Sequence, residues 1–367
     1  MGLRLLFVVT RSGGHLIPAF SMAEAVRRRY PDAEIRFAGT AQGVEARLVP
    51  RSGYVLETIP AIGLSRVFHP DLLRFPWMVA KGICRSFKII STYRPHMVIC
   101  TGGYVSGPVG LTAWALGIPL VFHEQNSLPG LTIRLLSRMA TQVYFGFQQA
   151  ALHIGGRERL CLGNPVREGW QRIDRAEARK RFGLEFDRPT LLVVGGSQGA
   201  RGINRAVAEA LPTLMERGLQ LIWQTGKPDY ETASSAAADR QDRVVVTAFI
   251  DDMAAAYSAA DLALTRAGAI TLAEEALLGV PALLVPLPTA AENHQEYNAR
   301  ARLRVGAAEM ILESNLDGPA LSEAVLRLLD DPEGLSRMAA RSRALSVPDA
   351  ADRIVTAMEQ AGLLKEA

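Results

Sequence analysis

The fold is decided by residues 191–199, which read LLVVGGSQG. Four consecutive apolar residues predict a buried strand, and the glycines that follow predict a tight turn into a helix. Residues 5–14, which read LLFVVTRSGG, repeat this layout near the start of the chain. Uniformly apolar strands that alternate with helical patterns are typical of parallel sheets covered on both faces. We therefore expect two α/β domains with doubly wound parallel sheets, whose ligands bind beyond the carboxyl ends of the strands in a cleft between the domains.

Length and composition agree with two globular domains. The chain has 367 residues, of which 49% are hydrophobic and 21% are charged, and about 150 residues make a typical domain. A Gly-Asn-Pro turn at 163–165 predicts a first domain at 1–163 and a second at 164–345. An amphipathic helix is expected within 346–367, and its periodicity allows it to pack on either domain.

Charge is unevenly distributed along the chain. Residues 1–163 contain 18 Lys and Arg against 8 Asp and Glu, whereas residues 164–367 contain 23 against 29. The first half is therefore expected to face an anionic partner, although a net charge of +4 is too small to indicate nucleic acid. The three cysteines, at 84, 100 and 161, have neither metal-ligand nor disulfide spacing, which favours a reducing cytosol.

Two segments raise the question of a membrane. Residues 95–123 contain no charged side chain, but glycines and prolines divide them into a predicted strand, helix and strand rather than a membrane span. Residues 62–90 mix basic with apolar and aromatic side chains, and a lipid surface with anionic headgroups favours this mixture. For 77–90 an ordinary amphipathic helix packed on the core is the simpler interpretation. The residues expected to face the membrane are Leu64, Arg66, Phe68, Leu72, Arg74 and Phe75.

Polar residues at the expected strand ends are the candidates for catalysis. His15 directly follows Gly13-Gly14, where an imidazole either accepts a proton near neutral pH or caps the next helix. The run 123–126, which reads HEQN, follows a predicted buried strand at 120–122. Burying four polar residues is costly unless they line a site.

A helix that begins near Ala269 is a candidate phosphate site, since its free N–H groups would follow the predicted strand 262–265. Glu274, one turn further in, is placed either to accept hydrogen bonds from a ribose or to complement the helix dipole. Glu275 points about 100° away, so we expect it to be solvated or in a surface pair. Arg167 is either a phosphate ligand or a surface arginine.

Several absent motifs narrow the function. Neither glycine turn matches GxGxxG or the Walker pattern, so NAD and ATP are disfavoured. No Asp-x-Asp pair is available to hold a metal on a nucleotide diphosphate, and we expect no metal and no cofactor. The Asp251-Asp252 pair is instead expected to cap a helix before Met253. The absence of G-x-S-x-G argues against an α/β-hydrolase.

Taken together, six motifs resemble a known family in their order and spacing. They are SGGH at 12–15, TGGYVSGP at 101–108, HEQN at 123–126, GNPVR at 163–167, GGSQGA at 195–200 and FIDDM at 249–253. This set resembles the MurG family, the bacterial undecaprenyldiphospho-muramoylpentapeptide β-N-acetylglucosaminyltransferases of glycosyltransferase family 28. The resemblance extends from about residue 4 to the last predicted helix. It departs at the first turn, where the family usually has GGTGGH and this chain has Thr10-Arg11-Ser12-Gly13-Gly14-His15.

The resemblance implies a GT-B fold and an inverting transfer in peptidoglycan synthesis. N-acetylglucosamine would move from UDP-GlcNAc to the C4 hydroxyl of lipid I, giving lipid II. It implies a first domain that takes the acceptor and a second that binds UDP-GlcNAc. It further implies a peripheral protein on the cytoplasmic face of the bacterial inner membrane.

The resemblance also implies roles for individual residues. Ile250 would meet the uracil and Glu274 the ribose. The acceptor hydroxyl in turn needs a base on the opposite face of the donor sugar, for which we expect His15, with Glu124 as the alternative. The residues expected to bind UDP-GlcNAc are Ser12, Gly13, Gly14, Asn126, Arg167, Ser197, Ile250, Ala269, Ile270, Thr271, Leu272, Ala273, Glu274 and Gln295. The competing interpretations are another UDP-sugar GT-B enzyme, such as a glycolipid glycosyltransferase or an epimerase, and a non-catalytic sugar-nucleotide-binding subunit.

Overall fold

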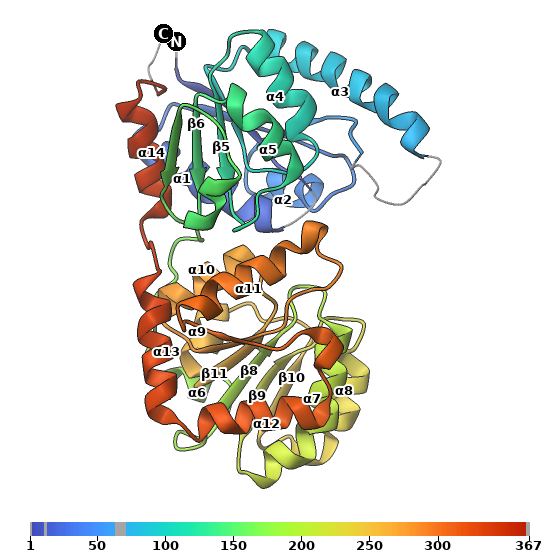
Figure 1. Cartoon of the computed structure of the whole chain (residues 1–367), viewed down its shortest axis with the longest axis vertical. Coiled ribbons are helices and arrows are strands. Elements are labelled where there is room, and N and C mark those ends of the chain that lie inside the picture. Colours follow the sequence, from blue (N-terminus) through green and yellow to red (C-terminus); the bar gives the residue numbers. More distant parts are fainter. Residues whose placement is uncertain (1, 11–12, 63–70, 365–367) are drawn as a thin grey trace. The chain divides into compact units, whose positions relative to one another are not determined.

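The chain forms two compact units, each built on one parallel sheet (Figure 1). A computed structural model describes residues 2–10, 13–62 and 71–364. One unit comprises Met1–Glu168 together with Val347–Ala367, and the other comprises Gly169–Ser346. The turn at 163–165 therefore lies within the first unit, a few residues before the chain enters the second.

The first unit has a seven-stranded sheet in the order β3-β2-β1-β4-β5-β6-β7, and all neighbouring strands are parallel. The strands are β1 Arg4–Val8, β2 Glu34–Gly39, β3 Val55–Thr58, β4 Met97–Cys100, β5 Leu120–Glu124, β6 Gln142–Phe145 and β7 Glu158–Cys161. The helices are α1 Gly13–Arg29, α2 Glu45–Arg51, α3 Asp71–Tyr93, α4 Ser106–Ala115, α5 Leu131–Leu136 and α14 Ala350–Gln360, with short 3₁₀ turns at Ser137–Met139 and Gln148–Leu152.

The second unit has a six-stranded parallel sheet in the order β10-β9-β8-β11-β12-β13. The strands are β8 Thr190–Val194, β9 Gln220–Gln224, β10 Val244–Thr247, β11 Leu262–Thr265, β12 Ala282–Leu284 and β13 Glu309–Met310. The helices are α6 Arg175–Arg181, α7 Arg201–Glu216, α8 Tyr230–Ala236, α9 Met253–Ala259, α10 Ala269–Leu278, α11 His294–Arg304, α12 Gly318–Leu329 and α13 Pro332–Ala344, with 3₁₀ turns at Ala238–Arg240, Ala291–Asn293 and Glu313–Asn315.

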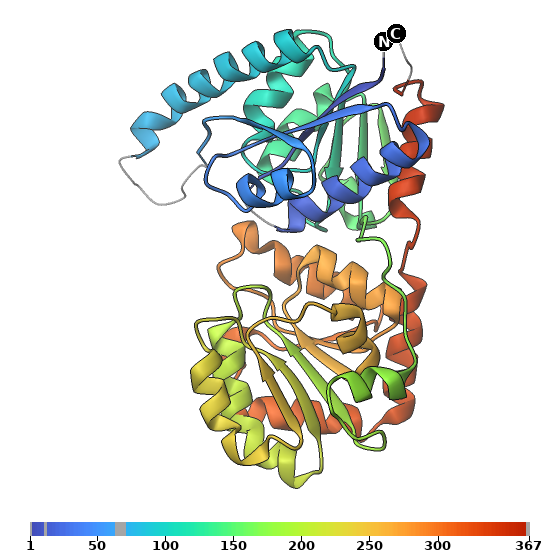
Figure 2. The same ribbon diagram turned by 180° about the vertical axis from the view of Figure 1, so that it is seen from behind.

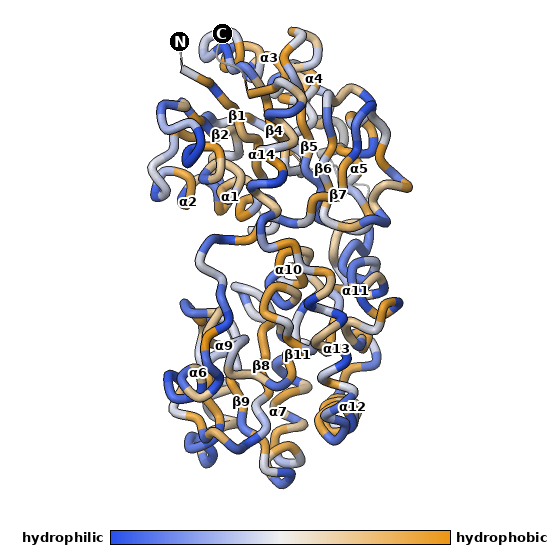
Figure 3. Tube along the Cα trace, turned by 90° about the vertical axis from the view of Figure 1, so that its left-hand side faces the viewer, coloured by the Kyte–Doolittle hydropathy of each residue, from blue (hydrophilic) through white to orange (hydrophobic). Residues whose placement is uncertain are grey.

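The central strands are buried on both faces, which explains why their sequences do not alternate between apolar and polar residues. Every residue of β4 and of β8 is buried. In Figure 3 the tube is mostly orange along β8. The fold class predicted from the strand–glycine–helix pattern is confirmed: both halves are doubly wound parallel sheets.

The segment without charges at 95–123 forms β4, α4 and β5, as predicted. None of the helices within the described residues is both long enough and apolar enough to cross a bilayer. Helix α3 lies beside α4 (Figure 2) and buries Ile89, Ile90 and Tyr93. The core packing expected for 77–90 is therefore confirmed for this face of α3.

The topology places the predicted loops at one position in each sheet. In the first sheet the strand order reverses between β1 and β4, and in the second between β8 and β11. Connections from neighbouring strands leave in opposite directions at such a point, which opens a crevice beyond the strand ends. The segments that begin at residues 9, 101, 195 and 266 follow these four strands.

Candidate active site

In the first unit, three loops meet beyond the carboxyl ends of β1, β4 and β5, which are neighbours in the sheet. His15 lies in the first turn of α1. A Cβ added to Gly102 would contact the His15 ring, and one added to Gly103 would clash with the side chain of Thr10. Glycine at both positions therefore lets the loop after β4 pack closely against the loop after β1.

The sequence predicted that the whole HEQN run follows the strand, but in the structure the strand extends into this run. His123 and Glu124 are the last two residues of β5, and both side chains are buried. Since His123 pairs with Tyr144 and Glu124 with Phe145, the neighbouring strand β6 extends β5 further than its apolar run indicated. Gln125 and the residues after it form the loop.

Gln125 connects the two histidines. Its Oε1 lies 2.9 Å from Nδ1 of His15, and its Nε2 lies 2.9 Å from Nδ1 of His123. The Nε2 of His123 lies 3.1 Å from the backbone oxygen of Gly163. Asn164 donates through Nδ2 to the backbone oxygen of Gln125 at 3.0 Å. The run at 123–126 and the turn at 163–165 are thus parts of one polar network.

Both histidines have pKa values below the usual one. Burial lowers the pKa of His15, opposed by the hydrogen bond to Gln125, the backbone oxygen of Thr101 and the charge of Glu45. Burial lowers the pKa of His123 to about 4. Both rings are therefore neutral near pH 7, so His15 can accept a proton there.

Glu124 is engaged with its own loop. Its Oε1 accepts hydrogen bonds from the backbone N–H of Asn126 at 2.8 Å and from Nδ2 of Asn126 at 3.1 Å. Its Oε2 accepts from the backbone N–H of Gly130 at 3.0 Å. A carboxylate with these three donors shapes the loop 125–130, and both of its oxygens are already engaged, which favours His15 as the base.

In the second unit, the glycine turn after β8 is held in a fixed shape. Gly196 and Gly199 have φ values of 95° and 75°, and the N–H of Gly199 donates to the backbone oxygen of Gly196 at 2.8 Å. The side chain of Gln224 donates to the backbone oxygens of Gly196 at 3.0 Å and Ala248 at 3.2 Å. Gln224 therefore joins the turn after β8 to the segment after β10, and Ser197 is exposed on that turn.

Helix α10 begins at Ala269. The preceding Gly268 has no side chain to cap the helix, and the first turn carries no acidic residue. Such a helix start favours an anion near its N–H groups. Of the residues expected there, Ala269, Ile270 and Leu272 are buried, whereas Thr271, Ala273 and Glu274 are half-buried.

The expectation for Glu275 is wrong. Its side chain is 2% exposed and accepts a hydrogen bond from Oγ1 of Thr265 at 2.7 Å. Burial raises the pKa of Glu275 to about 8, although Thr265 and the charge of Arg302 both lower it. Rotation about the helix axis correctly separates Glu275 from Glu274, but that direction leads toward Thr265 at the end of β11 instead of into solvent.

The other residues predicted to bind UDP-GlcNAc lie at separate positions within their units. Ile250 is buried after β10, and Gln295 on α11 accepts through Oε1 from the backbone N–H of Leu287 at 3.0 Å. Arg167 is exposed near the end of the first unit. Asp252 accepts from the N–H of Ala255 at 3.0 Å, which confirms the predicted helix cap.

Some predictions lie outside the described residues. These are the roles of Ser12, Leu64, Arg66 and Phe68, and the side-chain roles of Leu72 and Arg74. Phe75 is half-buried on α3. Gly13 and Gly14 are exposed at the start of α1.

Two further features of the second unit were missed from the sequence. Arg266, directly after β11, pairs with Glu313 at 2.5 Å and donates to the backbone oxygens of Val285 and Pro286, both at 3.2 Å. Gln224, at the end of β9, is the second. A polar residue at the end of a buried strand was the available signal for both, as it was for the HEQN run.

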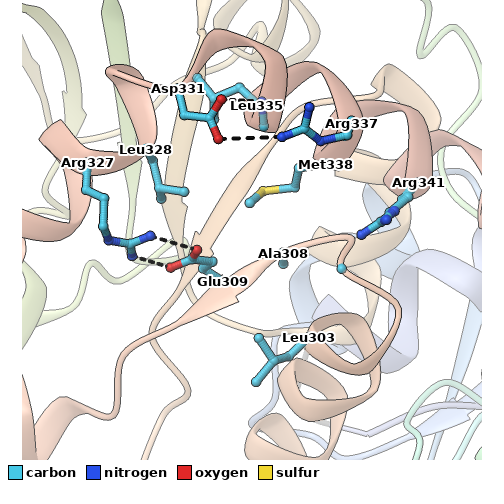
Figure 4. A pocket seen from close by; sticks show the side chains of 12 residues that line it. Leu303, Ala308, Glu309, Arg327, Leu328, Asp331, Leu335, Arg337, Met338 and Arg341 are labelled. Atoms are coloured by element: carbon cyan, nitrogen blue, oxygen red, sulfur yellow. Dashed lines mark hydrogen bonds and ion pairs between the residues drawn. The ribbon is translucent and has the colours of Figure 1, made fainter.

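A pocket of about 360 Å³ lies elsewhere in the second unit, between α11, β13, α12 and α13 (Figure 4). An ion pair between Arg327 and Glu309 crosses it, and Arg337 and Asp331 lie 3.7 Å apart at its edge. None of the predicted site residues lines this pocket. Within the described part of the chain, no group of three or more His, Cys, Asp and Glu residues is arranged to hold a metal ion.

Solved structures with this architecture include GT-B glycosyltransferases. The crystal structure of Acinetobacter baumannii MurG matches with a TM-score of 0.80 at 29% identity, covering 98% of this chain and 100% of that one. A UDP-GlcNAc 2-epimerase from Neisseria meningitidis, bound to UDP-GlcNAc, matches with a TM-score of 0.66 at 14% identity over 98% of this chain and 100% of that one. At that identity the epimerase shares the fold alone. The chain has the fold of a GT-B glycosyltransferase.

Sequence comparison identifies the family. The glycosyltransferase family 28 N-terminal domain matches residues 5–145, and the family's C-terminal domain matches residues 190–354. Two curated relatives carry the name UDP-N-acetylglucosamine--N-acetylmuramyl-(pentapeptide) pyrophosphoryl-undecaprenol N-acetylglucosamine transferase. The one from Desulforudis audaxviator is 40% identical over 98% of both chains, and the one from Desulfitobacterium hafniense strain Y51 is 41% identical over 96% of this chain and 98% of its own. The chain belongs to glycosyltransferase family 28 and is a hexosyltransferase.

Proposed function

We propose that this enzyme transfers N-acetylglucosamine from UDP-GlcNAc to the C4 hydroxyl of lipid I, with inversion at the anomeric carbon, to give lipid II. The observation that carries the proposal is the identity of about 40% over nearly the full length to transferases named for this reaction. A neutral, half-buried histidine at the switch point of the first sheet supports it chemically.

The first unit supplies the base. His15 takes the proton of the acceptor hydroxyl as its oxygen forms a bond to C1 of the donor sugar. The bond between C1 and the diphosphate oxygen breaks in the same step, and inversion follows from attack opposite the leaving group. General base catalysis of this kind contributes roughly 10²–10⁴ to the rate.

The second unit supplies most of the donor site. Ile250 meets the uracil and Glu274 the ribose, while the N–H groups of Ala269, Ile270 and Thr271 meet the diphosphate. We assign further donor contacts to Gly13, Gly14, Asn126, Arg167, Ser197, Leu272, Ala273 and Gln295, and to Ser12. The departing UDP gains negative charge, which fixed N–H dipoles and an arginine stabilise without reorganisation.

Binding of the enzyme to the cytoplasmic face of the membrane belongs to the same proposal, because the acceptor's lipid tail stays in the bilayer. Trp77 and Phe87 on α3 are 64% and 53% exposed. Lys81 lies 5.2 Å from the centre of the Trp77 ring, and Lys88 is exposed on the same helix. Exposed aromatic rings beside lysines suit anionic headgroups. This face extends the membrane surface expected at 64–75.

The decisive experiment measures transfer from radiolabelled UDP-GlcNAc to a soluble lipid I analogue. We expect a disaccharide product with the β configuration, formed at the same rate with and without EDTA. A diacylglycerol acceptor and the donor alone serve as controls. Product from diacylglycerol only would indicate a glycolipid glycosyltransferase, and an epimerised sugar nucleotide without transfer would indicate an epimerase. Either result would overturn the proposal.

A further inference from the structure

His123 sets the polarity of the network around His15. Its side chain is completely buried, and its Nε2 lies 3.1 Å from the backbone oxygen of Gly163. A carbonyl oxygen only accepts, so Nε2 of His123 carries a hydrogen. Burial lowers the pKa of His123 to about 4, so the ring is neutral. Its Nδ1 therefore has a lone pair and must accept.

The orientation of the Gln125 amide follows from this. Its Nε2 lies 2.9 Å from Nδ1 of His123 and 2.8 Å from the backbone oxygen of His123. Both atoms are acceptors, so only the amide N–H groups satisfy that side. The Oε1 of Gln125 must then face the other way, where Nδ1 of His15 lies 2.9 Å from it. Because an amide oxygen only accepts, Nδ1 of His15 is the donor.

We propose that His123 and Gln125 are positioning residues that hold the His15 imidazole as its Nδ1–H tautomer, so that Nε2 is the atom that takes the acceptor's proton. The proposal deepens the function above and rests on it. The hydroxyl proton moves to Nε2 as the glycosidic bond forms and the diphosphate leaves with the electron pair of the broken bond. The resulting imidazolium later returns the proton to water.

The neutral amide of Gln125 also affects the pKa of His15. Among the described residues, Gln125, the backbone oxygen of Thr101 and the charge of Glu45 all favour the protonated His15 ring, and burial opposes them. The neighbouring His123 is neutral and adds no charge at pH 7. A carboxylate in place of Gln125 would fix the same tautomer but would raise the pKa of His15. Glutamine thus orients the ring while leaving it unprotonated near neutral pH.

The direct test is ¹⁵N NMR of the full chain labelled at histidine. The chain has six histidines, and His15→Gln and His123→Leu variants identify the signals of these two. We expect Nδ1 of His15 to carry a hydrogen and Nε2 to show the shift of an unprotonated ring nitrogen. Replacing His123 with Leu releases the Gln125 amide, so a mixture of His15 tautomers is expected there. An Nε2–H tautomer in the wild-type chain would overturn the proposal.

Kinetics of Gln125 variants give a second, independent readout. Gln125→Met removes the acceptor, and we expect kcat to fall roughly 10²-fold at unchanged donor KM. Gln125→Glu keeps the acceptor, so kcat recovers substantially, and the acidic limb of the pH profile moves to higher pH. If Gln125 had only a structural role, the buried carboxylate of Gln125→Glu would lower kcat more than Gln125→Met does. Equal or greater loss in Gln125→Glu would therefore contradict the proposal, as would wild-type kcat in Gln125→Met.

The matched control is Gln142→Met. Gln142 is another buried glutamine of the same sheet, bonded to Tyr144 and Glu158 at the amino end of β6. We expect its kcat and pH profile to remain those of the wild type. The NMR result requires no turnover, so a wild-type chain without transfer activity would defeat the proposed function and leave the tautomer assignment standing. UDP binding by calorimetry checks that each variant retains its donor site.

Discussion

His15 and Glu124 are the two candidate bases, and their surroundings distinguish them. His15 has a neutral ring with one nitrogen bonded to Gln125, whereas both oxygens of Glu124 accept N–H groups from the loop 125–130. We expect His15→Ala to lower kcat roughly 10²–10⁴-fold with little change in donor KM, because only the transition state needs the base. Initial rates at saturating donor measure this. Glu124→Gln, the comparison variant, should mainly loosen the loop and raise the acceptor KM. Wild-type turnover in His15→Ala would move the base to Glu124.

The pH dependence tests the same residue without a substitution. Burial disfavours the charged imidazolium, so the pKa of His15 lies below its ordinary value of 6.5. The unprotonated, active form then persists as the pH falls through 6.5. We expect the acidic limb of kcat/KM, which reports the free enzyme, to lie below pH 6.5. A limb above pH 6.5 would show that a carboxylate raises the pKa of His15 or that another group is the base.

The glycine turn after β8 requires a residue without a side chain at position 199. Gly199 has a φ of 75°, and a Cβ there would clash with the backbone oxygen of Thr225. Gly183 has a similar φ of 68° but open space around it. Gly183→Ala should therefore cost about 1–2 kcal/mol of unfolding free energy from the left-handed backbone alone. Gly199→Ala should cost more and should also weaken UDP binding, as measured by thermal unfolding and calorimetry. Equal costs would mean that the turn moves aside without penalty.

Helix α3 makes the membrane proposal testable. Trp77→Ser and Phe87→Ser remove its two exposed rings, and we expect weaker sedimentation with anionic vesicles because less apolar area enters the interface. Transfer to a soluble acceptor should be unchanged. Phe186→Ser provides the control, because Phe186 is 58% exposed in the second unit. If the α3 variants lose soluble activity in proportion to vesicle binding, these rings support the fold instead.

The strands and helices of this chain differ in how well the sequence predicts them. Apolar runs predicted the central strands because burial on both faces removes alternation. The end of β5 was predicted too early, because pairing with β6 holds His123 and Glu124 in the strand although neither is apolar. Glu275 was expected to be solvated or in a surface pair, because no neighbouring residue in the sequence indicates that Thr265, ten residues earlier, contacts its carboxylate. The hydrogen bonds of Gln125 could not be predicted from the sequence either, because they depend on which strands become neighbours.

For the molecule as a whole, the chain leaves its first unit and later returns to it. Helix α14 packs on α1, and Ile354, Val355 and Met358 enter the core of the first unit. Arg28 pairs with Asp352 at 3.0 Å, and Arg29 pairs with Glu359 at 2.8 Å. The exposed ion pairs contribute little, so the apolar contacts supply most of the stabilisation. The last helix thus stabilises the unit that holds the proposed base, although residues 169–346, which precede it, belong to the other unit.

This return predicts a stability effect confined to one unit. Ile354 is completely buried, and Ile354→Ala should destabilise the first unit by about 2–5 kcal/mol through lost burial and the cavity left behind. Hydrogen exchange followed by mass spectrometry measures each unit separately. Exchange should accelerate along β1, β4 and α1 and stay unchanged along β8 and β11. Arg353→Ala, which removes an exposed side chain from the same helix, should leave both units unaffected. Acceleration in β8 and β11 as well would mean that the two units unfold as one.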